Sequence, residues 1–149
     1  MTSSPAFEDH TSVSEALKKV GLQVTAQRMA VYRAVHDTPH AMAEEVHCTV
    51  RSKIGAISRQ AVYDALNVMF ERGLIRRIQP AGSGARYEHR VDNHHHLVCR
   101  NCDSLVDIDC ATGKAPCLQA DNDHGFLIDE AEVIYWGICP KCQIAPNPN

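Results

Sequence analysis

Residues 94–102 read HHHLVCRNC and place three histidines and two cysteines within one short segment. A second cysteine pair occurs in residues 139–142, CPKC, after a gap of 36 residues. Two C-x2-C pairs match a closed tetrahedral zinc site in which four thiolates bind one ion. Polar residues between the cysteines of both pairs are not expected of ordinary buried cysteines. We therefore predict a structural zinc bound by Cys99, Cys102, Cys139 and Cys142.

Other functions of paired cysteines give two alternatives. A C-x-x-C pair also serves in thiol redox proteins, and Cys110 and Cys117 would then be further redox partners. A zinc hydrolase or deaminase would need an open zinc position, which four thiolates do not leave. The deaminase pattern of H-x-E with P-C-x-x-C is also incomplete, because no second cysteine follows Pro116-Cys117 at that spacing. We expect a protein that is not an enzyme.

The histidines of the same segment predict a second metal site. In an extended segment His94 and His96 project to one side, whereas His95 points away. Glu88 comes six residues before His94, and Asp107 lies on a neighbouring predicted strand. Two imidazoles with carboxylates form a harder site than four thiolates and suit Fe²⁺, Mn²⁺ or Zn²⁺. The alternative is a solvent-exposed histidine run.

Length and composition fit a small protein of one or two domains. The chain has 149 residues, only 5% of them aromatic, and small domains with thin cores often need a metal for stability. Seven cysteines is an odd number and zinc would account for four, which favours the reducing cytoplasm over a disulfide framework. Neither a signal peptide nor a membrane span is expected.

The charge differs between the two halves of the chain. The overall net charge is −3, which by itself argues against a nucleic-acid partner. Residues 1–80 hold ten Lys/Arg against eight Asp/Glu, whereas residues 81–149 hold five against ten. A mildly basic half joined to an acidic, His- and Cys-rich half predicts two domains with different tasks. We place them at residues 1–90 and 91–149.

Helix signals in the first half predict a winged helix. One helix would be capped by Ser14, a second by Thr25, a third would cover residues 43–53, and a fourth would be capped by Ser58. Residues 74–79 and 85–88 then read as two strands of a hairpin. Three or four short helices followed by a basic hairpin is the element order of a winged helix.

The fourth predicted helix would enter the major groove of DNA. Arg59 and Gln60 can reach base edges there, and Tyr63 can pack on a thymine methyl group. The alternative is an ordinary polar surface helix, which the nearby carboxylate of Asp64 favours. Phosphate contacts are expected from the hairpin arginines, namely Arg76, Arg77 and Arg86.

The second half reads as a small α/β domain. Strands are predicted at the end of residues 93–100, over 104–109 and over 132–137, and a short helix would run to His124. Zinc would tie the third strand back to the first. The predicted fold class is therefore α+β, with an N-terminal winged-helix DNA-binding domain followed by a small α/β domain.

Four segments carry a resemblance to a known family: residues 21–28 (GLQVTAQR), 58–63 (SRQAVY), 94–102 and 139–142. With them the chain resembles the ferric uptake regulator family of bacterial metal-responsive repressors. Residues 109–118 and 130–137 are most similar to the actinobacterial FurA/CatR branch. That branch represses a catalase-peroxidase gene and its own gene. The resemblance implies a cytoplasmic repressor that binds a palindromic operator as a homodimer through the second half.

The resemblance also implies particular functional residues. A histidine of the DNA-binding domain contributes to the regulatory site in this family, and His40 matches it. Fe²⁺ is the implied regulatory metal, with peroxide as a second signal, and a zinc- or manganese-responsive repressor is the alternative within the family. The implied regulatory ligands are His40, Glu88, His94, His96 and Asp107. The implied DNA-binding residues are Arg28, Ser58, Arg59, Gln60, Tyr63, Arg76 and Arg77.

Overall fold

The computed structural model describes residues 10–109 and 120–144. The chain divides into two compact units, Met1–Val91 and Asp92–Asn149, and each is described by itself below. Helices and strands occur in both, so the predicted α+β class is confirmed. Cys110 and Cys117, the further redox partners of the alternative hypothesis, lie outside the described residues.

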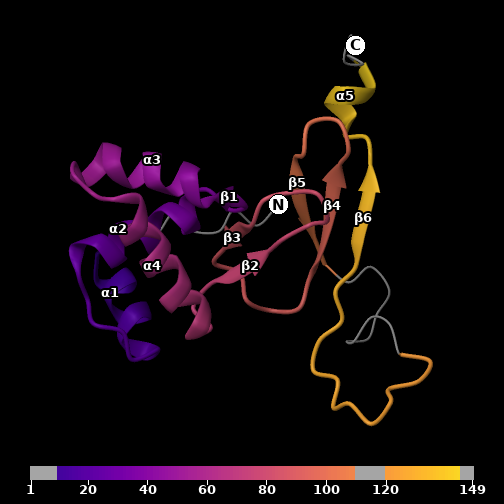
Figure 1. Ribbon diagram of the computed structural model, residues 1–149, viewed down its shortest axis with the longest axis horizontal. Coiled ribbons are helices and arrows are strands. Elements are labelled where there is room, and N and C mark those ends of the chain that lie inside the picture. The colour runs from indigo at the N-terminus through magenta and orange to yellow at the C-terminus, as the bar shows by residue number, and fades with distance from the viewer. Residues whose placement is uncertain (1–9, 110–119, 145–149) are drawn as a thin grey trace. The chain divides into compact units, whose positions relative to one another are not determined.

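The first unit combines four helices with a small sheet (Figure 1). Strand β3 is central in this antiparallel sheet, and its neighbours are β1 and β2. The two-residue strand β1 was not predicted, because two residues are too few to show the alternation of polar and apolar side chains that indicates a strand. The helices are α1 (His10–Lys19), α2 (Ala26–Asp37), α3 (Ala43–Ile54) and α4 (Arg59–Glu71), and the strands are β1 (Ala41–Met42), β2 (Arg76–Ile78) and β3 (Arg86–Glu88).

Two of the predicted helix starts are confirmed by their capping hydrogen bonds. The Thr25 hydroxyl accepts from the backbone N–H of Arg28 at 3.2 Å, and the Ser58 hydroxyl accepts from that of Ala61 at 3.0 Å. Such caps contribute about 1 kcal/mol each. The predicted cap at Ser14 is wrong. Helix α1 begins before it, because Val13 and Leu17, four residues apart, are both fully buried on its inner side.

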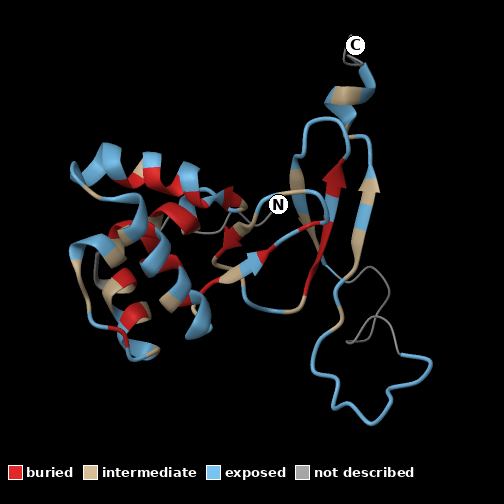
Figure 2. Ribbon diagram, viewed as in Figure 1, coloured by how far each residue is buried: buried red, intermediate tan, exposed pale blue. Residues whose placement is uncertain are grey.

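One hydrophobic core holds the first unit together (Figure 2). Helix α4 contributes Val62, Leu66 and Met69, all fully buried, at the spacing of one helical stripe. Burying each such side chain stabilises the fold by about 1.5–3 kcal/mol. Tyr63 lies outside this stripe and keeps 42% of its surface exposed. The core therefore fixes which side of α4 remains available to a partner.

The second unit is a three-stranded sheet in the order β5-β4-β6. Strand β4 (His95–Cys99) pairs antiparallel with β5 (Leu105–Ile108) and parallel with β6 (Ile134–Gly137). The parallel pairing places Cys99 opposite Gly137, two residues before Cys139. A short helix, α5 (Pro140–Ile144), follows β6 and contains Cys142.

The short helix predicted to run to His124 is wrong for the described residues 120–133, which are irregular. Asn122 accepts a hydrogen bond from the backbone N–H of His124, and Asp123 accepts from that of Gly125. Such local bonds from Asn and Asp stabilise turns in competition with a helix. In the part of the chain that the structure describes, no helix is both long and apolar enough to cross a membrane.

The end of α4 gives a prediction about stability. Gly73 follows the helix with a φ of 72°, the left-handed region, and an added Cβ would meet no atom within 4 Å. Gly73→Ala should therefore lower the free energy of unfolding by about 1–2 kcal/mol through backbone strain alone. Gly73→Asn should lower it less, because asparagine tolerates this conformation better. Urea denaturation of the three proteins tests this, and an alanine variant as stable as the parent would contradict it.

Candidate metal sites and DNA-binding surface

Four cysteines from two segments of the second unit form one cluster. Their sulfur atoms lie within 4.8 Å of one another, and Cys102 Sγ is 3.8 Å from Cys139 Sγ. A tetrahedral zinc with Zn–S bonds of about 2.3 Å has sulfur atoms about 3.8 Å apart, whereas a disulfide needs about 2.05 Å. The geometry fits a structural zinc with four thiolate ligands. The cluster consists of Cys99, Cys102, Cys139 and Cys142.

Three of these thiols have a pKa that differs from that of an ordinary cysteine. The backbone N–H of Cys139 donates to Cys99 Sγ at 3.3 Å, and this bond, together with those from the backbone of Cys102 and Asn101, lowers the pKa of the Cys99 thiol to about 6. The Ser104 hydroxyl lowers the pKa of Cys102, whereas the neighbouring Cys139 thiol raises the pKa of Cys142 to about 12. Four adjacent thiols cannot all ionise without a cation, so binding a divalent ion releases the remaining protons.

Two histidines of the second unit present the same nitrogen to one carboxylate. The Nε2 atoms of His94 and His96 lie 3.5 and 3.1 Å from Asp107 Oδ1. On the other side of its ring, His94 donates from Nδ1 to the carbonyl of Asp92 at 2.7 Å. In histidines that bind metals through one ring nitrogen, a hydrogen bond from the other nitrogen sets the tautomer and the orientation of the ring. The arrangement fits a divalent cation with nitrogen and oxygen ligands.

Glu132 is a further residue of this group that sequence reasoning did not identify. Its Oε1 lies 3.3 Å from His96 Nδ1, on the side of the ring away from Asp107. His95 does not join the group, because its Nδ1 accepts a hydrogen bond from the backbone N–H of Val133 at 3.0 Å. All three histidines are buried, unlike an exposed histidine run. The position of Glu132, two residues before the start of β6, was the available signal.

The first unit contains a separate imidazole–carboxylate pair. His40 Nε2 lies 3.1 Å from Glu88 Oε2, and Glu88 is fully buried. Strand pairing positions the two residues, since the backbone N–H of His40 donates to the carbonyl of Tyr87 at 2.8 Å. His40 also has a φ of 69°, unusual for a residue other than glycine. Such strain costs about 1–3 kcal/mol and persists where the surrounding structure holds it, often at functional sites.

The exposed side of α4 carries the predicted base-contacting residues. Arg59, Gln60 and Tyr63 are all exposed near its N-terminus. Two of them are held by carboxylates: Arg59 Nη2 lies 2.8 Å from Glu44 Oε1, and Gln60 donates to Asp64 at 2.8 Å. An exposed ion pair such as Arg59–Glu44 contributes only about 0–1 kcal/mol, so a DNA phosphate can replace the carboxylate. The acidic neighbours therefore leave this surface available to DNA.

The other predicted DNA-binding residues differ in accessibility. Arg77 is exposed and lies over the ring of Phe70, 4.6 Å from its centroid. Arg76 and Arg28 are half-buried, and Arg28 donates to the carbonyl of Gln23 at 2.9 Å. Ser58 is exposed but its hydroxyl caps α4. Arg77 is thus the best placed of the hairpin arginines to meet a phosphate.

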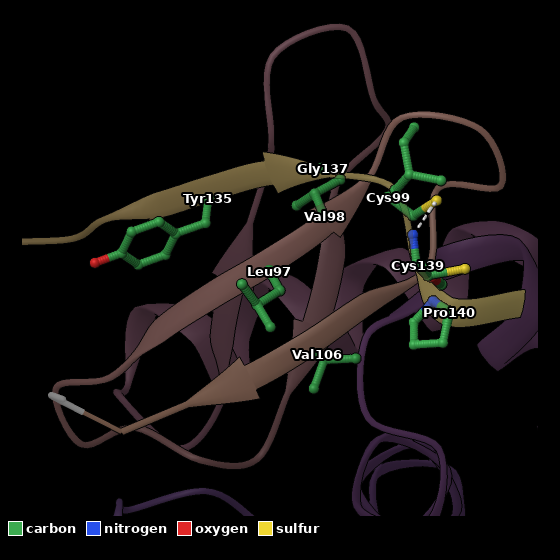
Figure 3. A pocket seen from close by; sticks show the side chains of 10 residues that line it. Leu97, Val98, Cys99, Val106, Tyr135, Gly137, Cys139 and Pro140 are labelled. Atoms are coloured by element: carbon green, nitrogen blue, oxygen red, sulfur yellow. Dashed lines mark hydrogen bonds between the residues drawn. The ribbon is translucent and has the colours of Figure 1, made fainter. Parts of the chain in front are cut away.

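One side of the sheet in the second unit is apolar and exposed (Figure 3). Leu97 of β4 pairs with Val106 of β5 and with Tyr135 of β6, so the three side chains form a row across the strands. They keep 43%, 54% and 51% of their surface exposed. The row borders a pocket of roughly 170 Å³ that extends to Ile138 and Pro140. An exposed apolar patch of this kind marks an interaction surface.

Comparisons with known proteins show the family of the chain. The ferric uptake regulator family matches residues 19–136. The transcriptional regulator FurA of Mycobacterium tuberculosis is 55% identical over 89% of this chain and 90% of its own length. The peroxide operon regulator of Bacillus subtilis is 26% identical over 89% of this chain and 92% of its own length. The chain belongs to the ferric uptake regulator family of metal-responsive transcriptional regulators.

A solved structure shows the same fold. The ferric uptake regulator of Helicobacter pylori superposes with a TM-score of 0.70 at 22% identity, covering 97% of this chain and 100% of the other. The predicted winged helix followed by a dimerisation domain is thereby confirmed as the fold.

The four-cysteine cluster gives a prediction about zinc. Cys99→Ser or Cys142→Ser should lose one zinc per chain and also lose the dimer or the fold, because metal-binding energy here is folding energy. Zinc content after dialysis and sedimentation measure the two effects. Cys117→Ser, at a cysteine that belongs to neither C-x2-C pair, is the matched control and should keep this zinc. A folded, dimeric, zinc-free Cys99→Ser/Cys142→Ser protein would overturn the assignment.

Proposed function

We propose that the protein is an Fe²⁺-dependent transcriptional repressor that binds palindromic operator DNA as a homodimer. The observation that carries the proposal is the orientation of the imidazole and carboxylate ligands in both units. His40 and Glu88 are paired in the first unit, and His94 and His96 face Asp107 in the second. Nitrogen and oxygen ligands favour Fe²⁺, and also admit Mn²⁺ or Zn²⁺.

Both groups of ligands would bind the same ion, and this sharing is the basis of regulation. Without the ion the two units would sample many relative orientations. With it they would favour the orientation in which the two α4 helices of a dimer match successive major grooves. A ligand shifts such an equilibrium only by its differential affinity, and a preference of about 100-fold would supply about 2.7 kcal/mol per site.

Structural zinc has a different task in this proposal. Cys99, Cys102, Cys139 and Cys142 would keep the second unit folded, whatever the state of the regulatory site. The thiol redox alternative is less favoured, because the two cysteine pairs form one cluster of zinc-site geometry. Thiolates of this kind persist in a reducing environment, which supports a location in the cytoplasm.

The apolar row of Leu97, Val106 and Tyr135 would form the dimer interface. Its exposure on a single sheet face supports self-association through the second unit. A two-fold symmetric dimer would pair the same patch on both copies and present two α4 helices to the two halves of a palindrome.

The DNA contacts divide into two kinds in this proposal. Arg59, Gln60 and Tyr63 would contact base edges, and Arg77 would contact phosphate. Arg28, Ser58 and Arg76 would add phosphate contacts after small side-chain movements. The gene targets we propose are a catalase-peroxidase gene and the protein's own gene, with peroxide as a signal that relieves repression.

The first test of the proposal compares two metals. Fe²⁺, when bound, supplies the electrons that reduce peroxide, whereas Mn²⁺ does not react in this way. Low peroxide added without oxygen should release operator DNA from the Fe²⁺-loaded protein only, and peptide mass should show one added oxygen on His40 or His94. Gel shift and mass spectrometry measure both effects.

The other outcomes separate the alternatives. Release with both metals, reversed by a thiol reductant, would support cysteine oxidation. No release with either metal would leave an iron-level sensor, and Glu88→Asp should then create peroxide sensitivity, because the shorter carboxylate is associated with faster oxidation in this family. Metal-independent binding of the operator would contradict the proposed function itself.

The second test separates base contacts from phosphate contacts. Tyr63→Ala should weaken operator binding more than binding to random DNA, by about 1–3 kcal/mol. Arg77→Ala should weaken both and reduce the slope of log K against log salt by about 1. Fluorescence anisotropy at several salt concentrations measures these values. Equal losses on both DNAs for Tyr63→Ala would remove its role in reading sequence.

A further inference from the structure

A third group of metal-ligating side chains lies on α3 of the first unit, separate from the sites above. Glu44, His47 and Cys48 occupy positions i, i+3 and i+4 and therefore share one side of the helix. One ligand atom from each lies within 4.8 Å of the other two. Glu44 and Cys48 are exposed, so an ion from solution can reach the group.

His47 is already oriented as a ligand. His47 is buried, with only 8% of its surface exposed, and its Nε2 lies 3.0 Å from the carbonyl oxygen of Ile57. A carbonyl only accepts, so Nε2 carries the proton and Nδ1 of the neutral ring keeps its lone pair. Metal-binding histidines typically donate their other N–H to a carbonyl or carboxylate in this way. The burial and the fixed orientation of the ring therefore suit a metal ligand.

We infer that Glu44, His47 and Cys48 form a cation site for a borderline-soft divalent ion of the Zn²⁺ class. A Glu-x-x-His pair on one helix is a known arrangement for metal ligands, and a thiolate shifts the preference from iron towards zinc. Zinc would need ligand distances of about 2.0–2.3 Å, and the two exposed side chains are the ones that can move to meet them. Three protein ligands leave a fourth position for water, so binding is weaker than at the four-cysteine site.

The site lies against the start of the recognition helix α4. Ile57, which accepts from His47, directly precedes the N-cap Ser58, and Arg59, which pairs with Glu44, directly follows it. A cation bound by Glu44 weakens the attraction of this carboxylate for Arg59. The guanidinium is then freer to contact DNA, so the bound ion acts on the DNA-binding surface.

Cobalt spectroscopy on the full-length protein tests the site. With the four-cysteine site filled by Zn²⁺, added Co²⁺ should give a cobalt–thiolate charge-transfer band, which the cysteine-free regulatory ligands cannot produce. The band should persist in Cys110→Ser and Cys117→Ser. The band should disappear in Cys48→Ser. Competition measurements should also show that this variant binds Zn²⁺ at the α3 site at least about tenfold more weakly than the parent does. An unchanged band in Cys48→Ser would overturn the inference.

A second variant addresses the histidine without removing its structural hydrogen bond. His47→Gln retains an N–H group that can reach the Ile57 carbonyl but lacks the imidazole ligand. It should keep the melting temperature within a few degrees and lose the cobalt–thiolate band. A folded His47→Gln protein with the parental band and affinity would contradict the site.

The DNA effect rests on the proposed function, whereas the cobalt band does not, so the two can fail separately. One added equivalent of Zn²⁺ should raise DNA affinity a few-fold more in the parent than in Cys48→Ser, since any effect at the regulatory site is common to both. The difference should vanish in Arg59→Ala. Equal responses of the parent and Cys48→Ser would remove the link to Arg59.

Discussion

The joining of β4 to the segment after β6 by four cysteines is the constraint on which the second unit depends. Parallel pairing sets Cys99 beside Gly137, and the N–H of Cys139 donates to the Cys99 sulfur. The same strand carries His96 and follows His94, so zinc bound at its end would also hold the proposed regulatory ligands in position. Loss of the cluster would therefore disturb metal sensing and dimerisation together.

Strand alternation keeps the two functions of β4 apart. His96 lies opposite Asp107 on one face, whereas Leu97 joins Val106 and Tyr135 in an exposed row on the other. Ligand chemistry separates the metals in the same way. Thiolates favour zinc, whereas imidazoles with carboxylates suit iron or manganese, so in the proposed function one short segment would serve a permanent ion and an exchangeable one.

Local chemistry explains which features the sequence could predict. The caps Thr25 and Ser58 and the two cysteine pairs each have a short-range signal, and the structure bears them out. Strand β1 and the link between His96 and Glu132 depend on pairing between distant segments, which single-sequence periodicity does not contain. The group on α3 was missed because His47 acquires its orientation only from the Ile57 carbonyl.

The central claim is that one ion, bound by ligands of both units, restricts their relative orientation. Single-molecule FRET between labels at Glu71 and Asp109, in dimers diluted with unlabelled chains, measures this most directly. The account predicts a broad distance distribution without metal, a narrow one with Fe²⁺, and a broad one with Fe²⁺ in His40→Asn, which tolerates the left-handed backbone of that position. The same distribution in all three samples would contradict it.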